Sequence, residues 1–178
     1  MKRILTVFFC AFLIFPVLWL QIGFAADATT VMSRWSRTEH YSDKDLQGFL
    51  DLKITYYSAE YVEALVQSEA QKNLWTQDEM DRYKYQLLKT LKLNECIVFH
   101  FEFDNSGSTM HMAPCDSFLS LWVGKRKISP IDYDKRFNFA LGGKRDGMVW
   151  FPRYDEKTGK SLLEKVSTVK LDIQGGIS

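Results

Sequence analysis

Large apolar side chains recur at every second position between Ile97 and Phe103, and this alternation constrains the fold more than any other feature. The apolar positions are Ile97, Phe99, Phe101 and Phe103, and Val98, His100 and Glu102 lie between them. Successive side chains of a strand point to opposite faces, whereas those of a helix repeat at about 3.6 residues. The segment is therefore predicted to be a β-strand whose aromatic face needs a second layer to cover it.

The same alternation, or a short apolar run, marks further strands along the chain. They are expected at 50–56, 119–123, 137–139, 148–151 and 169–173. Turn residues separate them at Gly124, Ser129-Pro130 and Gly142-Gly143, and the glycine pair is expected to close a hairpin. Short strands joined by Gly and Pro turns predict an antiparallel β-sandwich.

Two helices are expected to interrupt this β pattern after the first main strand. Ser58 precedes a helical segment near 59–73, and Thr76 opens a capping box before a second helix near 77–92. Residues 46–178 are thus predicted to form a single, mainly β domain with a two-helix insertion. Residues 26–45 are predicted to be a loose leader with a possible edge strand.

The N-terminus has the layout of an export signal. Lys2 and Arg3 precede the apolar run 4–20, which the small residues Gly23 and Ala25 follow. This order is typical of a secretory signal peptide. Residues 1–25 are therefore predicted to be removed after Ala25, which places the protein in the periplasm or at the cell surface. Because the apolar run is at the short limit for spanning a bilayer, an uncleaved anchor is the alternative.

The composition excludes two classes of protein. Aromatic residues make up 15% of the chain, which excludes a disordered protein. Lys and Arg number 23 against 22 Asp and Glu, which excludes a globally basic nucleic-acid binder. The expected partner is a protein or an anionic component of the cell envelope. The oligomeric state does not follow from the sequence.

Several local motifs resemble those of a group of uncharacterised exported bacterial proteins with an immunoglobulin-like β-sandwich. The motifs are the strand-to-helix passage 54–60, the helix capped by Thr76, the Ser129-Pro130 turn after the strand that carries Trp122, and the segment 148–152. The resemblance implies an immunoglobulin-like fold and an exported protein. It implies no catalytic residue.

Two cysteines remain once Cys10 leaves with the signal, and an oxidising compartment favours a disulfide between them. If 96–104 and 107–115 form a hairpin that turns at Asn105-Ser106, Cys96 lies directly opposite Cys115. Such a bridge contributes about 3 kcal/mol in the loop-entropy description. The alternative is a pair of buried thiols in a reducing compartment.

The same hairpin register places His100 opposite His111, with Glu102 two residues along on the same face. Two imidazoles and a carboxylate suit zinc or copper, so these residues are a candidate metal site. The alternative is a pair of solvent-facing histidines.

No motif points to catalysis. No serine lies in a G-x-S-x-G elbow, and Gly142-Gly143-Lys144 lacks the remaining residues of a phosphate-binding loop. The protein is therefore predicted to be no enzyme and to need no cofactor.

Charge is unevenly distributed along the chain. Residues 42–104 hold 12 acids and 7 bases, whereas residues 121–153 hold 8 bases and 3 acids. The bases near strand ends are Lys125, Arg126, Lys127, Lys135, Arg136, Lys144 and Arg145. If these turns cluster at one end, they form a positive rim that can meet an anionic lipid, a glycan or an acidic protein. The alternative is that the turns are simply solvated.

Together these features predict a non-enzymatic exported envelope or surface module that acts by binding a protein or an envelope component. The alternative is a periplasmic protein that binds a metal or small ligand through His100 and His111.

Overall fold

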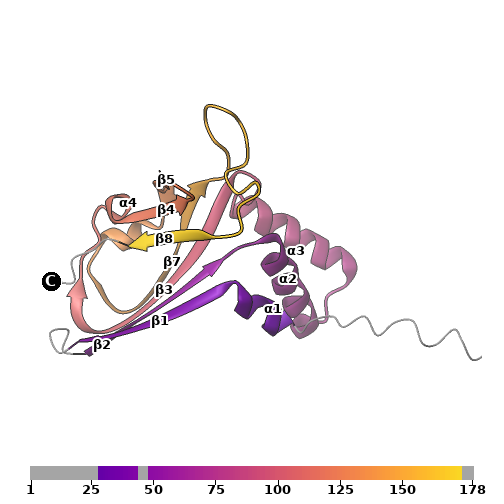
Figure 1. The fold of residues 1–178 in the computed structure, drawn as a ribbon. Helices are drawn as coiled ribbons and strands as arrows, with labels where there is room; N and C mark the ends of the chain where they lie inside the picture. The colour runs from indigo at the N-terminus through magenta and orange to yellow at the C-terminus, as the bar shows by residue number, and fades with distance from the viewer. Residues whose placement is uncertain (1–27, 44–47, 174–178) are drawn as a thin grey trace, which may run out of the picture.

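Two antiparallel sheets share one apolar core in the computed structural model, which describes residues 28–43 and 48–173 (Figure 1). The larger sheet has five strands in the order β1-β2-β3-β7-β6, and the smaller has three in the order β5-β4-β8. In chain order the strands are β1 (Ser36–Asp43), β2 (Gly48–Tyr56), β3 (Cys96–Met110), β4 (Leu119–Val123), β5 (Arg126–Ile128), β6 (Asp132–Tyr133), β7 (Leu141–Pro152) and β8 (Val169–Ile173). The predicted antiparallel β architecture with helices is thus confirmed. The predicted signal peptide, 1–25, lies outside the described residues.

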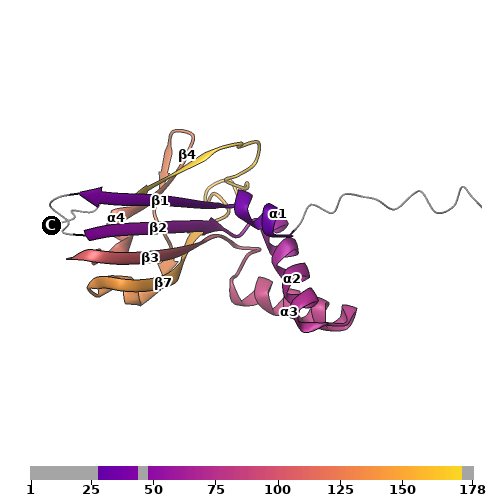
Figure 2. The same ribbon diagram turned by 90° about the horizontal axis from the view of Figure 1, so that it is seen from below.

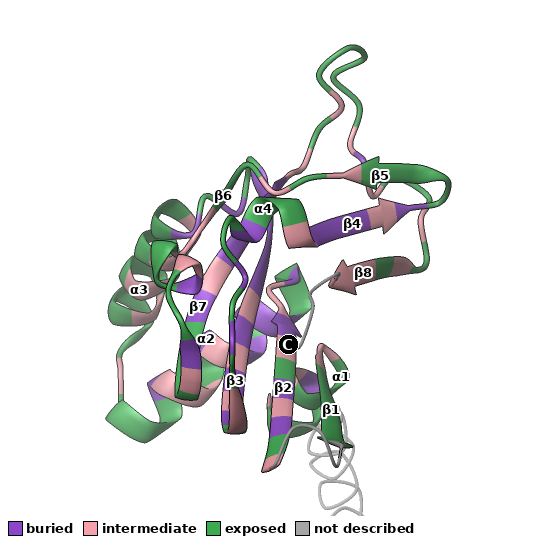
Figure 3. Cartoon of the chain, turned by 90° about the vertical axis from the view of Figure 1, so that its left-hand side faces the viewer, coloured by how far each residue is buried: buried purple, intermediate pink, exposed green. Residues whose placement is uncertain are grey.

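The core between the sheets is built on the alternating face of β3. The four apolar residues at its odd-numbered positions, Ile97, Phe99, Phe101 and Phe103, are all buried. They share a cluster with Leu121 of β4 and Val149 of β7, and buried segments lie along β3, β4 and β7 in Figure 3. Burying one such side chain contributes about 1.5–3 kcal/mol. The aromatic face is therefore turned inward, as the alternation predicted.

Strand β3 continues through the point where a turn was expected. Asn105 is only 3% exposed. Its side-chain amide donates to the backbone carbonyls of Ser108 at 2.8 Å and Leu141 at 2.9 Å. These bonds satisfy carbonyls beside an irregularity in the pairing of β3 with β7. The predicted hairpin of 96–104 with 107–115 is therefore wrong, and β3 pairs with β2 and β7 instead.

Two other local predictions fail in the same region. Gly142 and Gly143 lie inside β7 rather than in a turn, and Gly143 has a φ of 64° opposite Asn105. The first two residues of the expected strand 137–139 lie in a 3-10 helix, η1 (Lys135–Asn138), which the Asp134 side chain caps. Phe137 is 1% exposed and Phe139 70% exposed, so the two rings do not share a buried face.

Both predicted helices form between β2 and β3, as α2 (Ala59–Asn73) and α3 (Gln77–Thr90). The Ser58 side chain accepts the N–H of Tyr61, and Thr76 begins the capping box of α3. Figure 2 shows the helices at one end of the strands of the larger sheet.

The two helices cover part of the outer face of the larger sheet, which is the face turned away from the smaller sheet. Val62 of α2 packs in a second cluster with Cys96 and Val98, the even-numbered positions of β3. Trp150 of β7 joins this cluster, and its indole N–H donates to the carbonyl of Leu91 at 3.0 Å.

The segment predicted to be a loose leader forms a helix, α1 (Ala28–Arg34), followed by the edge strand β1. Its small and β-branched residues have weak helix propensity, so contacts with α2 must stabilise it. The side chains of Arg34 and Trp35 both donate to the Glu60 carboxylate of α2, and Val31 is buried. The possible edge strand is confirmed. A last short helix, α4 (Cys115–Phe118), precedes β4.

Candidate binding site on the larger sheet

Half of the outer face of the larger sheet carries charged side chains. Leu50 and Leu52 of β2 and Phe101 and Phe103 of β3 point into the core, so the residues between them point outward. We call this surface the charged face, and its members are His40, Asp51, Lys53, His100, Glu102, Asp104, Lys144 and Asp146. Because α2 and α3 lie at the other end of these strands, they leave the charged face open (Figure 2).

A hollow of about 430 Å³ lies on the charged face. Residues of β2, β3 and β7 line it, among them Asp51, His100, Glu102, Arg145 and Asp146. The hollow is therefore built from three neighbouring strands that lie far apart in the sequence.

Opposite charges pair across the strands of this face. Lys53 Nζ lies 2.7 Å from Glu102 Oε1. His100 lies between two carboxylates, with Nε2 at 3.2 Å from Asp146 Oδ2 and Nδ1 at 3.7 Å from Glu102 Oε1. Lys144 Nζ lies 3.5 Å from Asp104 Oδ2. At the edge of the sheet His40 pairs with Asp51 and stacks on the exposed ring of Phe49, with ring centroids 5.8 Å apart.

Like charges also lie directly opposite each other on this face. Asp51 is the cross-strand partner of Asp104, and Glu102 is the partner of Asp146. Directly opposed like charges destabilise a sheet. The four carboxylates outnumber Lys53, Lys144 and Arg145, the bases that line the same hollow, which leaves an excess of one negative charge. The charged face therefore suits a cationic group.

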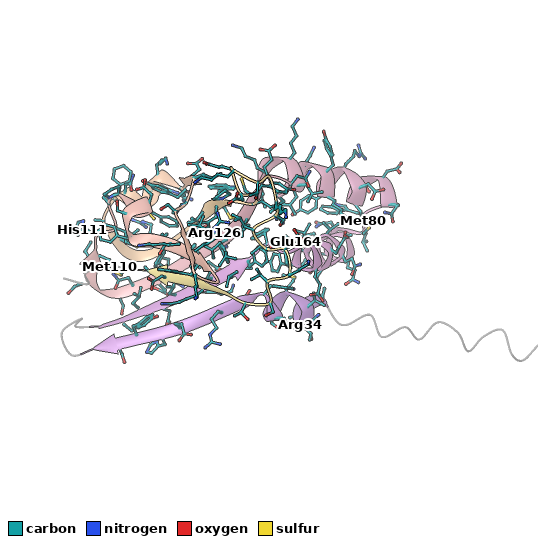
Figure 4. The ribbon with its side chains drawn as sticks, turned by 45° about the horizontal axis from the view of Figure 1, so that its top comes forward. Arg34, Met80, Met110, His111, Arg126 and Glu164 are labelled. Carbon is teal, nitrogen blue, oxygen red and sulfur yellow. The ribbon has the colours of Figure 1, made fainter. Side chains whose placement is uncertain are left out.

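The predicted metal site does not form. His100 pairs with Thr55 on one side and Met148 on the other, so His111 is not its neighbour. His111 is exposed beyond the end of β3, and Figure 4 shows it beside Met110 at the end of the molecule away from the helices. Within the ranges 28–43 and 48–173, no three His, Cys, Asp or Glu side chains are arranged to hold a metal ion. Of the predicted ligands, Glu102 lies beside His100 but His111 does not. The hairpin that would have placed His111 opposite His100 does not form.

The predicted disulfide does not form either, because the larger sheet separates the two cysteines. Cys96 lies in the cluster under the helices, and Cys115 lies in the core between the sheets. Both are free, buried thiols. Burial raises the pKa of Cys96 and raises that of Cys115 to about 12, which makes both poor nucleophiles.

The predicted positive rim is divided between the two ends of β7. Arg126 pairs with Asp155, which follows the end of β7, whereas Lys144 and Arg145 lie near its start. At the usual rise of a strand these ends are roughly 25 Å apart. The seven bases therefore do not form one surface.

Most of these bases also have carboxylate partners. Arg126 and the hydrogen bonds of Thr158 hold the pKa of Asp155 well below its usual range. Lys135 pairs with Asp132 at 3.0 Å, and Arg136 pairs with Asp134 at 2.6 Å. In the part of the chain that the structure describes, Lys125, Lys127 and Arg145 are the members of the set that lack such a partner.

Sequence reasoning found only part of the charged face. The alternation placed His100 and Glu102 outward on one strand, and it placed Asp51 and Lys53 outward on another. It did not show that these two strands are neighbours. No sequence pattern marked Asp146 as a site residue, apart from its position just before a predicted strand.

Comparison of the chain with known protein families, curated proteins and solved structures gives no match. The fold and the site define a two-sheet β protein with a helical cover over half of one face and an open charged surface on the other half.

Proposed function

We propose that the protein is an exported, non-catalytic binding module that contacts a basic segment of a partner protein through the charged face. The observation that carries the proposal is the strand register, which places two pairs of like charges directly opposite each other, Asp51 with Asp104 and Glu102 with Asp146. A sheet surface optimised for stability alone would avoid them. A lysine or arginine that bridges the opposed carboxylates relieves this repulsion on binding.

Exposure favours the same proposal. The Asp146 side chain is 60% exposed and that of Glu102 is 41% exposed, so an incoming cation can reach both carboxylates. The exposed ring of Phe49 adds apolar contact area at the border of the charged face. Aromatic residues such as Phe are enriched at protein interfaces.

The thiols and histidines support the non-catalytic part of the proposal, and the first 25 residues support the exported part. The thiols are buried with raised pKa values, and the two histidines of the charged face contact carboxylates rather than a hydroxyl or thiol. The basic, apolar and small order of the first 25 residues supports export. Among the described helices, none has the length and apolar character needed to cross a membrane.

We also propose that the two-sheet arrangement is immunoglobulin-like. Within the described residues the chain passes between the sheets after β3, after β5 and after β7, which supports a sandwich with crossed connections. NMR distances across the core test this: an absence of contacts between the buried side chains of β4 and β7 would contradict a sandwich.

The charged face is tested first by NMR titration with a short oligo-arginine peptide. We expect amide shifts at Glu102, Asp104 and Asp146, weakening with added salt, and about tenfold weaker binding to Glu102→Gln/Asp146→Asn. Asp81→Asn/Glu156→Gln is the matched control, because it removes two exposed carboxylates elsewhere. Equal loss in both double variants, or shifts outside the charged face, would contradict the proposal.

A second test identifies the partner class in the native envelope. A photo-reactive phenylalanine analogue at Phe49 lies at the border of the charged face, and the same analogue at Tyr85 lies on α3. We expect a protein crosslink from Phe49 that Glu102→Gln/Asp146→Asn abolishes, and none from Tyr85. Crosslinking to lipid or glycan instead of protein would reject the proposed partner class.

A further inference from the structure

A second cleft, of about 500 Å³, lies between the two helices and the segment that follows β7. Its apolar wall comes from three different elements: Val62 of α2, Leu88 of α3 and Leu93 of the connection to β3. Val62 and Leu93 are 2% and 6% exposed, so this wall is part of the core under the helices. Tyr57 and Tyr154 add aromatic rings. The volume matches that of small-ligand sites.

Arg153 gives this cleft a positive charge. Its side chain lies at the end of β7, and its Nε and Nη2 atoms donate to the Cys96 carbonyl at 3.2 and 3.0 Å. The Arg153 backbone is also held on both sides, since its N–H donates to the Glu95 carbonyl and its carbonyl accepts from Leu162. The guanidinium is therefore fixed in place by backbone groups.

No carboxylate of the described residues forms an ion pair with Arg153, although it is half-buried. A guanidinium has five N–H donors, and one carbonyl cannot satisfy them all. The other cation of the cleft, Lys84, is already paired with Glu63. A smaller hollow of about 210 Å³ is also lined by Arg153 and Tyr154. These two residues therefore border both the hollow and the cleft. Among the described residues, Arg153 is thus a positioned cation with no carboxylate at ion-pair distance, although Glu95 and Asp132 line the smaller hollow beside it.

We propose that this cleft binds an apolar or aromatic group that carries a carboxylate. The carboxylate pairs with Arg153, and the apolar group lies against Val62, Leu88 and Leu93. Arginine suits this role because its planar fork binds both oxygens of a carboxylate. A free organic acid and the C-terminus of a peptide both present this chemistry. The site is independent of the charged face, which suits cations.

The experiment compares each acid with its neutral counterpart by NMR titration of the wild-type protein. One pair is phenylacetate with phenylacetamide, and the other is a peptide ending in leucine with its C-terminal amide. We expect shifts at Leu88, Leu93 and Arg153 and at least about tenfold tighter binding of the acid in one or both pairs. A larger preference for the acid in the phenylacetate pair identifies a free organic acid as the ligand class. A larger preference in the peptide pair identifies the C-terminus of a peptide.

Variants test the role of the guanidinium. Arg153→Gln should remove the preference for the acid, whereas Lys157→Gln, an equal change of charge on an exposed loop, should keep it. Arg153→Lys should keep the preference with weaker binding. If Arg153→Gln does not fold, the wild-type comparison still decides: acids that bind no better than their amides overturn the proposal. Shifts at Glu102 and Asp146 belong to the charged face, so failure at one site leaves the other standing.

Discussion

Replacing Asp146 by Asn should stabilise the protein, although most substitutions destabilise. Asp146 lies directly opposite Glu102, at a Cβ separation of about 5 Å for such pairs. Two charges about 6 Å apart at the dielectric constant of water repel by roughly 0.7 kcal/mol. Asn keeps a polar contact with His100 while removing the repulsion. We therefore expect a net gain of about 0.5 kcal/mol, within the range measured for cross-strand pairs.

Urea unfolding followed by circular dichroism in low salt measures this gain. With a slope of about 2 kcal/mol/M, the midpoint should rise by about 0.25 M. Because the repulsion is screened, the difference should disappear in about 1 M salt. Glu156→Gln is the control, since this exposed residue has no opposed carboxylate across a strand, and it should leave the midpoint unchanged. A lower midpoint for Asp146→Asn in low salt, or a gain that persists at high salt, would refute the reasoning about like charges on this face.

Four further predictions follow from the described contacts. Phe101→Ala should destabilise the fold by about 3–5 kcal/mol in urea unfolding, because the ring is fully buried between the sheets; a loss below about 1 kcal/mol would mean that the sheets do not share this core. Thr76→Ala should cost about 1 kcal/mol through loss of the capping box, and Thr76→Ser should restore most of it. Because the folded-state pKa of Asp155 is lowered, its stabilising effect is present above its ordinary pKa of about 4 and lost as pH falls below it; the stability difference between wild type and Asp155→Asn should shrink in acid, and a difference that grows there would contradict the ion pair with Arg126. Cys96 and Cys115 should react with a thiol reagent only after unfolding, and both should then be labelled without reductant; labelling of neither would restore the disulfide.

Local sequence patterns predicted the elements whose stability is itself local. Alternation predicted β2, the first half of β3, β4 and β8, because one buried face is enough to fix the period. The capping residues Ser58 and Thr76 predicted the starts of α2 and α3, because the hydrogen bonds that begin a helix are made within one turn. α1 was missed, because Glu60 of α2 holds it in place and no local pattern records that contact.

The errors about the site have one physical origin. Alternation fixes which face a side chain occupies, but it does not fix which strand lies next to it. The turn residues Asn105 and Ser106 suggested a hairpin, and both the disulfide and the metal pair depended on that single register. Instead, hydrogen bonds from the buried Asn105 amide stabilise β3 as a continuous strand through this point. His100 therefore faces Asp146, whose position could be known only from the pairing of β3 with β7.

The helical insertion explains why one sheet carries two candidate sites of opposite preference. The even-numbered side chains of β3 are apolar at Cys96 and Val98 and charged at Glu102 and Asp104, so the outer face changes character near His100. The apolar half needs a cover, and α2 and α3 provide it. The cleft that contains Arg153 lies between these helices and the segment after β7. Where they end, the carboxylates are left in water with too few cations. A partner that binds both surfaces would need a basic stretch and an apolar group with a carboxylate.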